Sequence, residues 1–352
     1  MSSYQENRKK YITIKTREIL KELPPFIFDF FRGIEHTSSV NTRLAYAYDI
    51  RIFFEYIHKN IETLIPLVSI AKITLEDLDK VSPRDIEMYL EYLSYYEKSL
   101  DESHAICYQN GQNGKARKLA SLKTLYHYFY RQERIKNNPT SIVDMPKIYE
   151  KPIVKLEVDE VARLLDLIES GEALTDKQKI YHNFTKKRDL ALFAMLLGTG
   201  IRVSECVGLN LEDVDFNYNG IKITRKGGNE SIVYFSKEVE TILRDYIVER
   251  TTKNCKTIDY PLFLSMQDKR ISVRSVQLLV KKYSALVTSL KKITPHKLRS
   301  TYGTQLYQET GDIYLVADVL GHKDVNTTKK HYAKMDDQRR RMAASIVKLR
   351  ET

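Results

Sequence analysis

The residues of this sequence with the clearest chemical potential are cations and one phenol in its C-terminal half. Four motifs carry them: GTGIRVSEC at 198–206, TRKGGNE at 224–230, TPHKLRSTYGT at 294–304 and LGHKDVNTTKKHY at 320–332. The candidates within these motifs are two guanidiniums, one ammonium, two imidazoles and one phenol, at Arg202, Lys226, His296, Arg299, His322 and Tyr332. This set suits nucleophilic attack on a phosphodiester without a metal ion.

Each group has a task in such a reaction. A phosphodiester is an anion and gathers more charge in its transition state, which bidentate contacts from Arg202 and Arg299 would stabilise. The phenol of Tyr332 has a reference pKa of about 10, so it needs neighbouring cations or a base to act near neutrality. Lys226 could protonate the leaving alkoxide. The sequence lacks a phosphate-binding P-loop and an evident carboxylate cluster, so we expect no ATP, metal ion or other cofactor.

Each motif taken alone also has an ordinary structural explanation. Arg202 and Glu205 could form a simple helix ion pair, and Lys226 could be a solvated turn lysine. His296 and Arg299 could lie on the surface of a capped helix, and a tyrosine is usually a half-buried packing residue. The complete set, in this order along the chain, favours the chemical interpretation.

Local signals predict the elements that must position these groups. Gly198 and Gly200 are expected to interrupt a helix just before Arg202. Strands at 221–224 and 231–235, with Asn219-Gly220 and Gly227-Gly228 as turns, would place Lys226 on a hairpin.

Two further helix ends complete the predicted site. Thr294 can cap a helix whose first residue is Pro295, which puts His296 beside free backbone N–H groups that favour a phosphate. Gly321 can end the preceding helix just before His322.

Helical periodicity dominates the first 140 residues. Between 42 and 57 the apolar residues fall three and four apart, at Ala47, Ile50, Phe54 and Ile57. A helix begins at Pro83 and runs on through 87–96, and another begins near Ala116 with Leu119, Leu122, Tyr126 and Phe129 as its buried stripe. Lys115, Arg117, Lys118, Ser121 and Lys123 are expected near its start or on its other sides.

A segment with little periodicity at 144–155, which holds Pro146 and Pro152, is predicted to link two domains. We therefore predict a helical domain at 1–150 and a catalytic domain at 151–352. The first is expected to be all-helical. The fold class is mainly α, with a small antiparallel β-sheet in the C-terminal domain.

Composition narrows the class of protein. The net charge of +11 in 352 residues favours a polyanionic partner, with nucleic acid first and an anionic membrane surface second. No apolar run approaches a membrane span, and the polar N-terminus is not typical of a signal peptide. Three cysteines without paired spacing, Cys107, Cys206 and Cys255, fit a reducing cytoplasm.

The motifs containing Arg202, Lys226, His296, Arg299, His322 and Tyr332 resemble those of the tyrosine recombinase (phage integrase) family, and within it the Xer recombinases. Segments 39–57 and 115–129 look like the looser motifs of that family's helical core-binding domain. In many Xer proteins the tyrosine stands nine residues after the Gly-His histidine, a position that His331 holds here. Tyr332 is ten residues on, a spacing shared by some integrases.

The resemblance implies roles for each residue. Arg202 and Arg299 would bind the scissile phosphate, Lys226 would protonate the 5′ hydroxyl, and His296 would give acid–base help. His322 would hydrogen-bond a phosphate oxygen, Tyr332 would form a 3′-phosphotyrosyl bond, and Glu205 would orient the site.

The resemblance also implies a two-domain DNA-breaking-rejoining fold that clamps double-stranded DNA and a homotetramer on two sites. The apolar residues Met342, Ile346 and Leu349 would form a C-terminal exchange helix that docks on a neighbouring protomer or on its own core. The Xer likeness further implies a role in chromosome dimer resolution, with the translocase FtsK as a possible partner. No membrane partner is expected. The same motifs leave open an integrase or excisionase of a mobile element and a non-catalytic DNA-binding regulator. Candidates for DNA reading are Arg43, Lys115, Arg117, Lys118 and Lys123.

Overall fold

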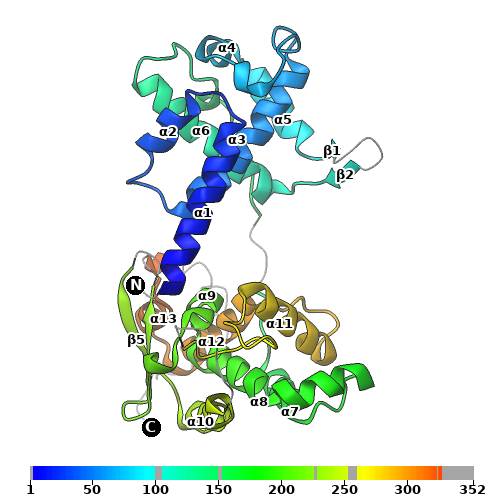
Figure 1. The fold of residues 1–352 in the computed structure, drawn as a ribbon, viewed down its shortest axis with the longest axis vertical. Coiled ribbons are helices and arrows are strands. Elements are labelled where there is room, and N and C mark those ends of the chain that lie inside the picture. The colour runs from blue at the N-terminus through cyan, green and yellow to red at the C-terminus, as the bar shows by residue number, and fades with distance from the viewer. Residues whose placement is uncertain are drawn as a thin grey trace, which may run out of the picture. The chain divides into compact units, whose positions relative to one another are not determined.

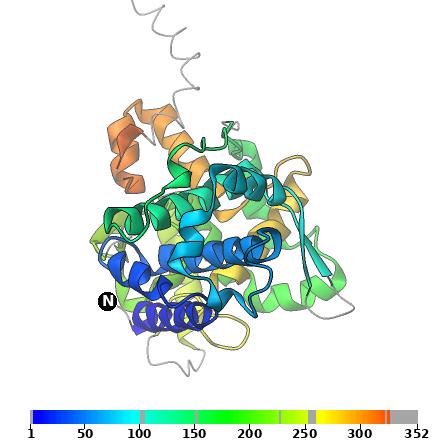
Figure 2. The ribbon, with the colours of Figure 1, turned by 90° about the horizontal axis from the view of Figure 1, so that it is seen from above.

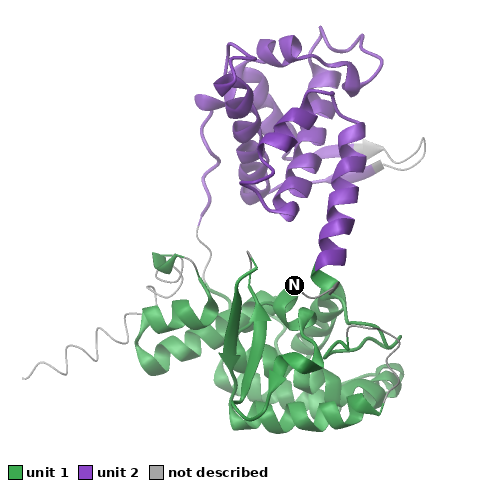
Figure 3. Cartoon of the chain, turned by 60° about the vertical axis from the view of Figure 1, so that its left-hand side comes forward, with its two compact units in different colours: residues 1–5, 152–352 green, residues 6–151 purple. Residues whose placement is uncertain are grey.

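The computed structural model describes residues 3–99, 105–149, 153–225, 228–252, 260–322 and 324–326. The chain divides into two compact units, one formed by 6–151 and the other by 1–5 together with 152–352 (Figure 3). This division lies beside the boundary predicted from the sequence, although residues 1–5 group with the C-terminal unit. Among the described helices, none combines the length and apolar character that crossing a membrane requires.

The N-terminal unit is built from helices that surround an aromatic core. Its helices are α1 (Ser3–Lys21), α2 (Ile27–Gly33), α3 (Val40–Asn60), α4 (Leu75–Lys80), α5 (Pro83–Tyr92) and α6 (Gln112–Arg131), with short 3-10 turns at Ile70–Lys72 and Pro139–Ser141. The predicted apolar stripes of α3 and α6 are buried as expected, including Ile50, Phe54, Leu119 and Phe129, which are all 0% exposed. Periodicity identified these faces because apolar residues three and four apart lie on one side of a helix.

A two-stranded sheet in this unit was not predicted. Helix α5 has Pro83 at its first position and a Ser82 capping box, but it ends at Tyr92 rather than continuing to 96. Strands β1 (Tyr96–Ser99) and β2 (Ala105–Tyr108) then pair antiparallel and project from the helices of their own unit (Figure 1, Figure 2). The Tyr96 and Tyr108 rings stack across the strands with centroids 5.3 Å apart, which favours the hairpin over more helix. The all-helical prediction for this domain was therefore wrong.

The C-terminal unit is mostly helical with one small sheet, as predicted. Its helices are α7 (Val158–Ser170), α8 (Asp176–Thr199), α9 (Val203–Gly208), α10 (Lys237–Thr251), α11 (Val273–Val287), α12 (Pro295–Thr310) and α13 (Ile313–Leu320), with a 3-10 turn at Leu211–Asp213. Strands β3 (Val214–Asp215), β4 (Gly220–Thr224) and β5 (Glu230–Tyr234) form an antiparallel sheet in the order β3-β4-β5. Helix α8 packs on α7, α10, α12 and α9. The last two of these carry Arg299 and Arg202.

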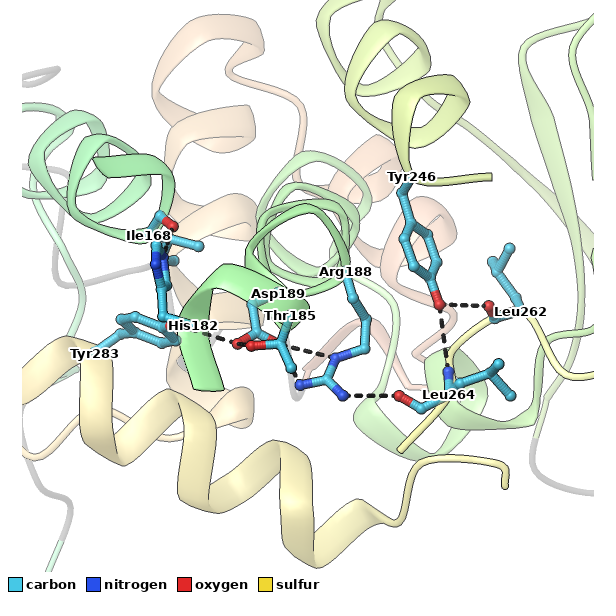
Figure 4. A network of polar contacts seen from close by, with 9 residues as sticks. All are labelled: Ile168, His182, Thr185, Arg188, Asp189, Tyr246, Leu262, Leu264 and Tyr283. Atoms are coloured by element: carbon cyan, nitrogen blue, oxygen red, sulfur yellow. Dashed lines mark hydrogen bonds and ion pairs between the residues drawn. The ribbon is translucent and has the colours of Figure 1, made fainter. Parts of the chain in front are cut away.

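A buried polar network fixes the middle of α8 (Figure 4). The Asp189 carboxylate is 1% exposed and accepts hydrogen bonds from Arg188 (Nε at 2.9 Å and Nη2 at 2.6 Å), Thr185 (3.2 Å) and the Tyr283 hydroxyl (3.1 Å). Arg188 also donates to the Leu264 carbonyl at 2.9 Å. Burial and the nearby Asp189 charge raise the pKa of Tyr283, so its hydroxyl stays a donor. The network joins α8 to α11 and to the segment that contains Leu264.

Asp189→Ala is expected to lower the free energy of unfolding by about 3–5 kcal/mol, because it leaves the buried Arg188 charge without its partner. The matched control is Asp159→Ala on α7. Its ion pair with Arg163 (2.9 Å) joins side chains that are 71% and 59% exposed, so its loss should cost about 1 kcal/mol or less. Urea unfolding of both variants measures the difference. Equal losses for the two would show that the α8 network contributes no more than a surface pair.

Candidate active site

The candidate site is organised around the C-terminal end of α13. Gly321 adopts a left-handed conformation (φ 61°) and its N–H donates to the Asp318 carbonyl at 2.8 Å. The His322 N–H donates to the Ala317 carbonyl at 2.9 Å. This pair of bonds is a Schellman motif, and it ends the helix at the glycine, as predicted. The backbone therefore leaves the helix at Gly321, and His322 is the first residue after it.

Arg202 reaches this helix end from α9. Its backbone N–H donates to Glu205 Oε2 at 2.8 Å, and its guanidinium donates to Glu205 Oε1 at 2.9 Å and to the Gly321 carbonyl at 3.1 Å. Glu205 is only 8% exposed, so its carboxylate is a buried countercharge. Arg202 is thus the N-cap residue of α9, and Glu205 orients its side chain.

Arg299 reaches the same helix end from α12. Its side chain is buried, with 4% exposure. Nη1 donates to the Gly200 carbonyl at 2.6 Å and Nη2 donates to the Leu320 carbonyl. Arg202 and Arg299 therefore bind the carbonyls of adjacent residues, Gly321 and Leu320. Two cations held this close repel each other, and an anion bound beside them would relieve that repulsion.

Two glycines allow this close approach, and a third has a different role from the one predicted. A Cβ on Gly200 (φ 64°) would lie 2.4 Å from Cδ1 of Tyr302, so only glycine suits this turn between α8 and Arg202. Gly321 is equally crowded.

Gly198 was expected to interrupt the helix, but α8 continues through it to Thr199. A Cβ there would lie 2.5 Å from Cγ2 of Val239, so Gly198 permits close helix packing instead.

The other predicted site residues have different placements. His296 is exposed in the first turn of α12, three residues before Arg299. Pro295 occupies the first helical position as predicted, but the Thr294 side chain makes no capping hydrogen bond. His322 is partly buried. Lys226, Tyr332 and the exchange helix with Met342, Ile346 and Leu349 lie outside the described residues.

Sequence reasoning missed a third arginine at this helix end. Arg225 follows β4, and its Nη2 donates to the Val319 carbonyl at 3.0 Å. Its only signal in the sequence was its position directly before Lys226, because an arginine at a strand end is usually a surface residue. Arg225, Arg299 and Arg202 thus bind three consecutive carbonyls, those of residues 319, 320 and 321.

The Cys206 thiol lies next to Glu205 in the chain and is a possible alternative nucleophile. Burial raises the pKa of the Cys206 thiol, so it stays protonated and is a poor nucleophile. Within the described ranges, no three His, Cys, Asp or Glu side chains gather closely enough to hold a metal ion.

The five candidates for DNA reading all make contacts within the N-terminal unit. Arg43 donates to the Glu35 carbonyl at 2.7 Å, Lys115 to Ser94 Oγ at 2.7 Å and Lys123 to the Val143 carbonyl at 2.8 Å. Each of these contacts uses one N–H donor, and the side chains keep further donors for bases or phosphates. Their role in DNA reading stays a prediction.

Arg117 and Lys118 share a buried carboxylate. Asp49 is 1% exposed, is hydrogen-bonded by Arg117 and lies 3.7 Å from the Lys118 ammonium. Burial raises the pKa of Asp49 and lowers that of Lys118. Lys118 and Ser121 are 4% and 0% exposed, so the prediction that they lie off the buried side of α6 was wrong. A second face of this helix is covered, and Lys118 there serves as a countercharge to Asp49.

Comparison with known proteins now identifies the family. Residues 155–339 match the model of the phage integrase family, and this match covers the whole predicted set from Arg202 to Tyr332. The chain belongs to the phage integrase family. It is therefore a tyrosine recombinase, an enzyme of site-specific DNA recombination.

Relatives of two Xer types match over most of the chain. The tyrosine recombinase XerC of Caldanaerobacter subterraneus subsp. tengcongensis is 31% identical and the match covers 96% of this chain and 91% of the relative. The tyrosine recombinase XerS of Lactococcus lactis subsp. cremoris is 28% identical, with 91% and 95% covered. Both Xer types therefore match at similar identity, and the comparison does not single out XerS.

Solved structures share the fold. The XerH site-specific recombinase bound to a palindromic difH substrate, in a post-cleavage complex, has a TM-score of 0.60 and 20% identity, with 98% of this chain and 97% of the other covered. The Tn1549 transposon integrase in complex with circular intermediate DNA has a TM-score of 0.63 and 20% identity, with 89% and 97% covered. These likenesses support the predicted fold class of a mainly helical recombinase with a small sheet.

Proposed function

We propose that this recombinase cleaves and rejoins double-stranded DNA at a defined site through a 3′-phosphotyrosyl bond to Tyr332. The observation that carries the proposal is the meeting of Arg202 and Arg299 at the Gly321 and Leu320 carbonyls, directly before His322. Two guanidiniums from helices far apart in the sequence, with a histidine next in the chain, suit the two non-bridging oxygens of a phosphodiester. A structural ion pair would need only one of them.

The proposed reaction exchanges one ester for another. The Tyr332 oxygen attacks the scissile phosphorus and forms the P–O(Tyr) bond, while the bond from phosphorus to the 5′ oxygen breaks. The phenol proton passes to a base, for which His296 is the candidate, and Lys226 gives a proton to the departing 5′ oxygen. Arg202, Arg299 and His322 stabilise the charge on the non-bridging oxygens. The 5′ hydroxyl of a partner strand reverses these steps, so no external energy source is required.

The cellular role that fits best is chromosome dimer resolution. XerC and XerS relatives matched over more than nine-tenths of this chain support a Xer role. A homotetramer on two DNA sites, action in the cytoplasm and possible work with the translocase FtsK belong to this proposal. An integrase of a mobile element would use the same chemistry on other sites, and the location of the preferred site in the genome separates the two.

A trapping experiment tests the chemistry. The preferred DNA site is first selected from fragments that the protein retains, and is then nicked beside the scissile phosphate so that the short product diffuses away. We expect a covalent protein–DNA adduct in the presence of a chelator and without ATP, and peptide mapping should find the nucleotide on Tyr332. An adduct that forms only with a divalent ion, or that maps to another residue, would contradict the proposal.

A further inference from the structure

Arg225 connects two elements that the proposed reaction must hold together. Its backbone closes the turn between β4 and β5, because its N–H donates to the Asn229 carbonyl at 2.7 Å and its carbonyl accepts from the Gly228 N–H at 3.1 Å. Its side chain leaves this turn and donates to the Val319 carbonyl in the last turn of α13 at 3.0 Å. One residue thus ties the base of the hairpin to the helix end where Arg202 and Arg299 meet.

The contact with α13 is close as well as polar. A Cβ built on Gly321 would lie 1.8 Å from Nη1 of Arg225 and 2.4 Å from its Cζ. The guanidinium therefore occupies the space that any other residue at position 321 would fill. Since Gly321 also accepts the hydrogen bond from Arg202, a displacement of Arg225 and a displacement of Arg202 affect the same residue.

The charge on Arg225 fits this location. Carbonyls at a helix C-terminus carry partial negative charge and favour cations. The planar guanidinium packs against Gly321 while it donates to Val319, which a lysine ammonium on a flexible stem does less well. Lys226 follows directly in the chain, and glycines follow it at 227 and 228. An anchor at Arg225 therefore fixes the residue to which Lys226 is covalently bonded.

We propose that Arg225 is a positioning residue: it holds the end of β4 against the last turn of α13, and so fixes the point from which the next residue, Lys226, continues the chain beside the phosphate-binding arginines. This inference rests on the proposed function, in which Lys226 protonates the 5′ leaving oxygen. Arg225 acts through Lys226 in this account and need not touch the DNA.

Substitution of the leaving atom gives the decisive test. DNA with sulfur at the 5′-bridging position of the scissile phosphate releases a thiolate, whose conjugate acid has a pKa of about 8.5, so it departs without a proton donor. Arg225→Ala is expected to slow adduct formation on ordinary DNA about 100-fold, the size expected when a catalytic group is misplaced by about 1 Å. On the sulfur substrate its rate should return to within a few-fold of the wild-type rate.

Four variants make the readout specific. Lys226→Ala should show the same rescue by sulfur, whereas Arg299→Ala should be slow on both substrates because it acts on the phosphate. Arg163→Ala, on the exposed ion pair of α7, should behave as wild type on both. Arg225→Lys should fall between wild type and Arg225→Ala on ordinary DNA. Hydrogen exchange at the Gly228 amide should be faster in both Arg225 variants.

Several results would overturn the inference. A wild-type rate for Arg225→Ala on ordinary DNA would show that the anchor is unnecessary, and an equal defect on both substrates would place Arg225 on the phosphate or in general folding. If Arg225→Ala does not fold, the same comparison with Arg225→Lys decides the question. A wild-type enzyme that forms no adduct on either DNA would instead contradict the proposed function itself.

Discussion

Tyr332→Phe is expected to abolish the covalent protein–DNA adduct while leaving DNA affinity unchanged. The substitution removes only the phenolic oxygen, which is the atom proposed to bond to phosphorus, and keeps the ring. Loss of the nucleophile in a hydrolytic enzyme costs about 10⁶-fold in turnover, so the adduct should fall below detection. Gel electrophoresis of the nicked substrate under denaturing conditions measures it.

The matched control for this prediction is Tyr314→Phe. Tyr314 lies on α13, close in sequence to the candidate site, and is 72% exposed. It should form the adduct at the wild-type rate. If Tyr332→Phe still became linked to DNA, the nucleophile would be another residue, and the ten-residue spacing from His322 would have misled the assignment.

Arg299→Ala is expected to slow cleavage by about 10²–10³-fold, the size measured when one oxyanion donor is removed from a preorganised site. Part of the effect is structural, because Arg299 is 4% exposed and its loss leaves the Gly200 and Leu320 carbonyls without this donor. Single-turnover cleavage at saturating DNA, well below the unfolding temperature, isolates the chemical part.

Arg299→Lys and Arg274→Ala complete the comparison. Lysine keeps the charge but lacks the planar fork, so Arg299→Lys should remain slow. Arg274 is an exposed arginine on α11, and its removal should leave cleavage unchanged. Full activity of Arg299→Lys would mean that charge alone suffices and that the two-carbonyl geometry has no role in the reaction.

Local features of the site were predictable because they depend on neighbouring residues in the chain. The Gly321 helix end, Pro295 at the start of α12 and the buried stripes of α3 and α6 all follow from backbone conformation and helical period. Errors arose where a distant partner decided the outcome. Gly198 lies inside α8, where its missing Cβ allows contact with Val239, and Lys118 is buried beside the Asp49 carboxylate of α3.

The sequence alone determined which chemical groups are available and the order in which they occur. It also determined most of the helices and the hairpin that carry them, because hydrogen bonding and apolar period act over a few residues. Only the tertiary structure decided that Arg202, Arg225 and Arg299 meet at consecutive carbonyls, over separations of 119, 94 and 21 residues from their acceptors. Such meetings depend on how α8, α12, α13 and the hairpin pack, and no local preference of the chain specifies that packing.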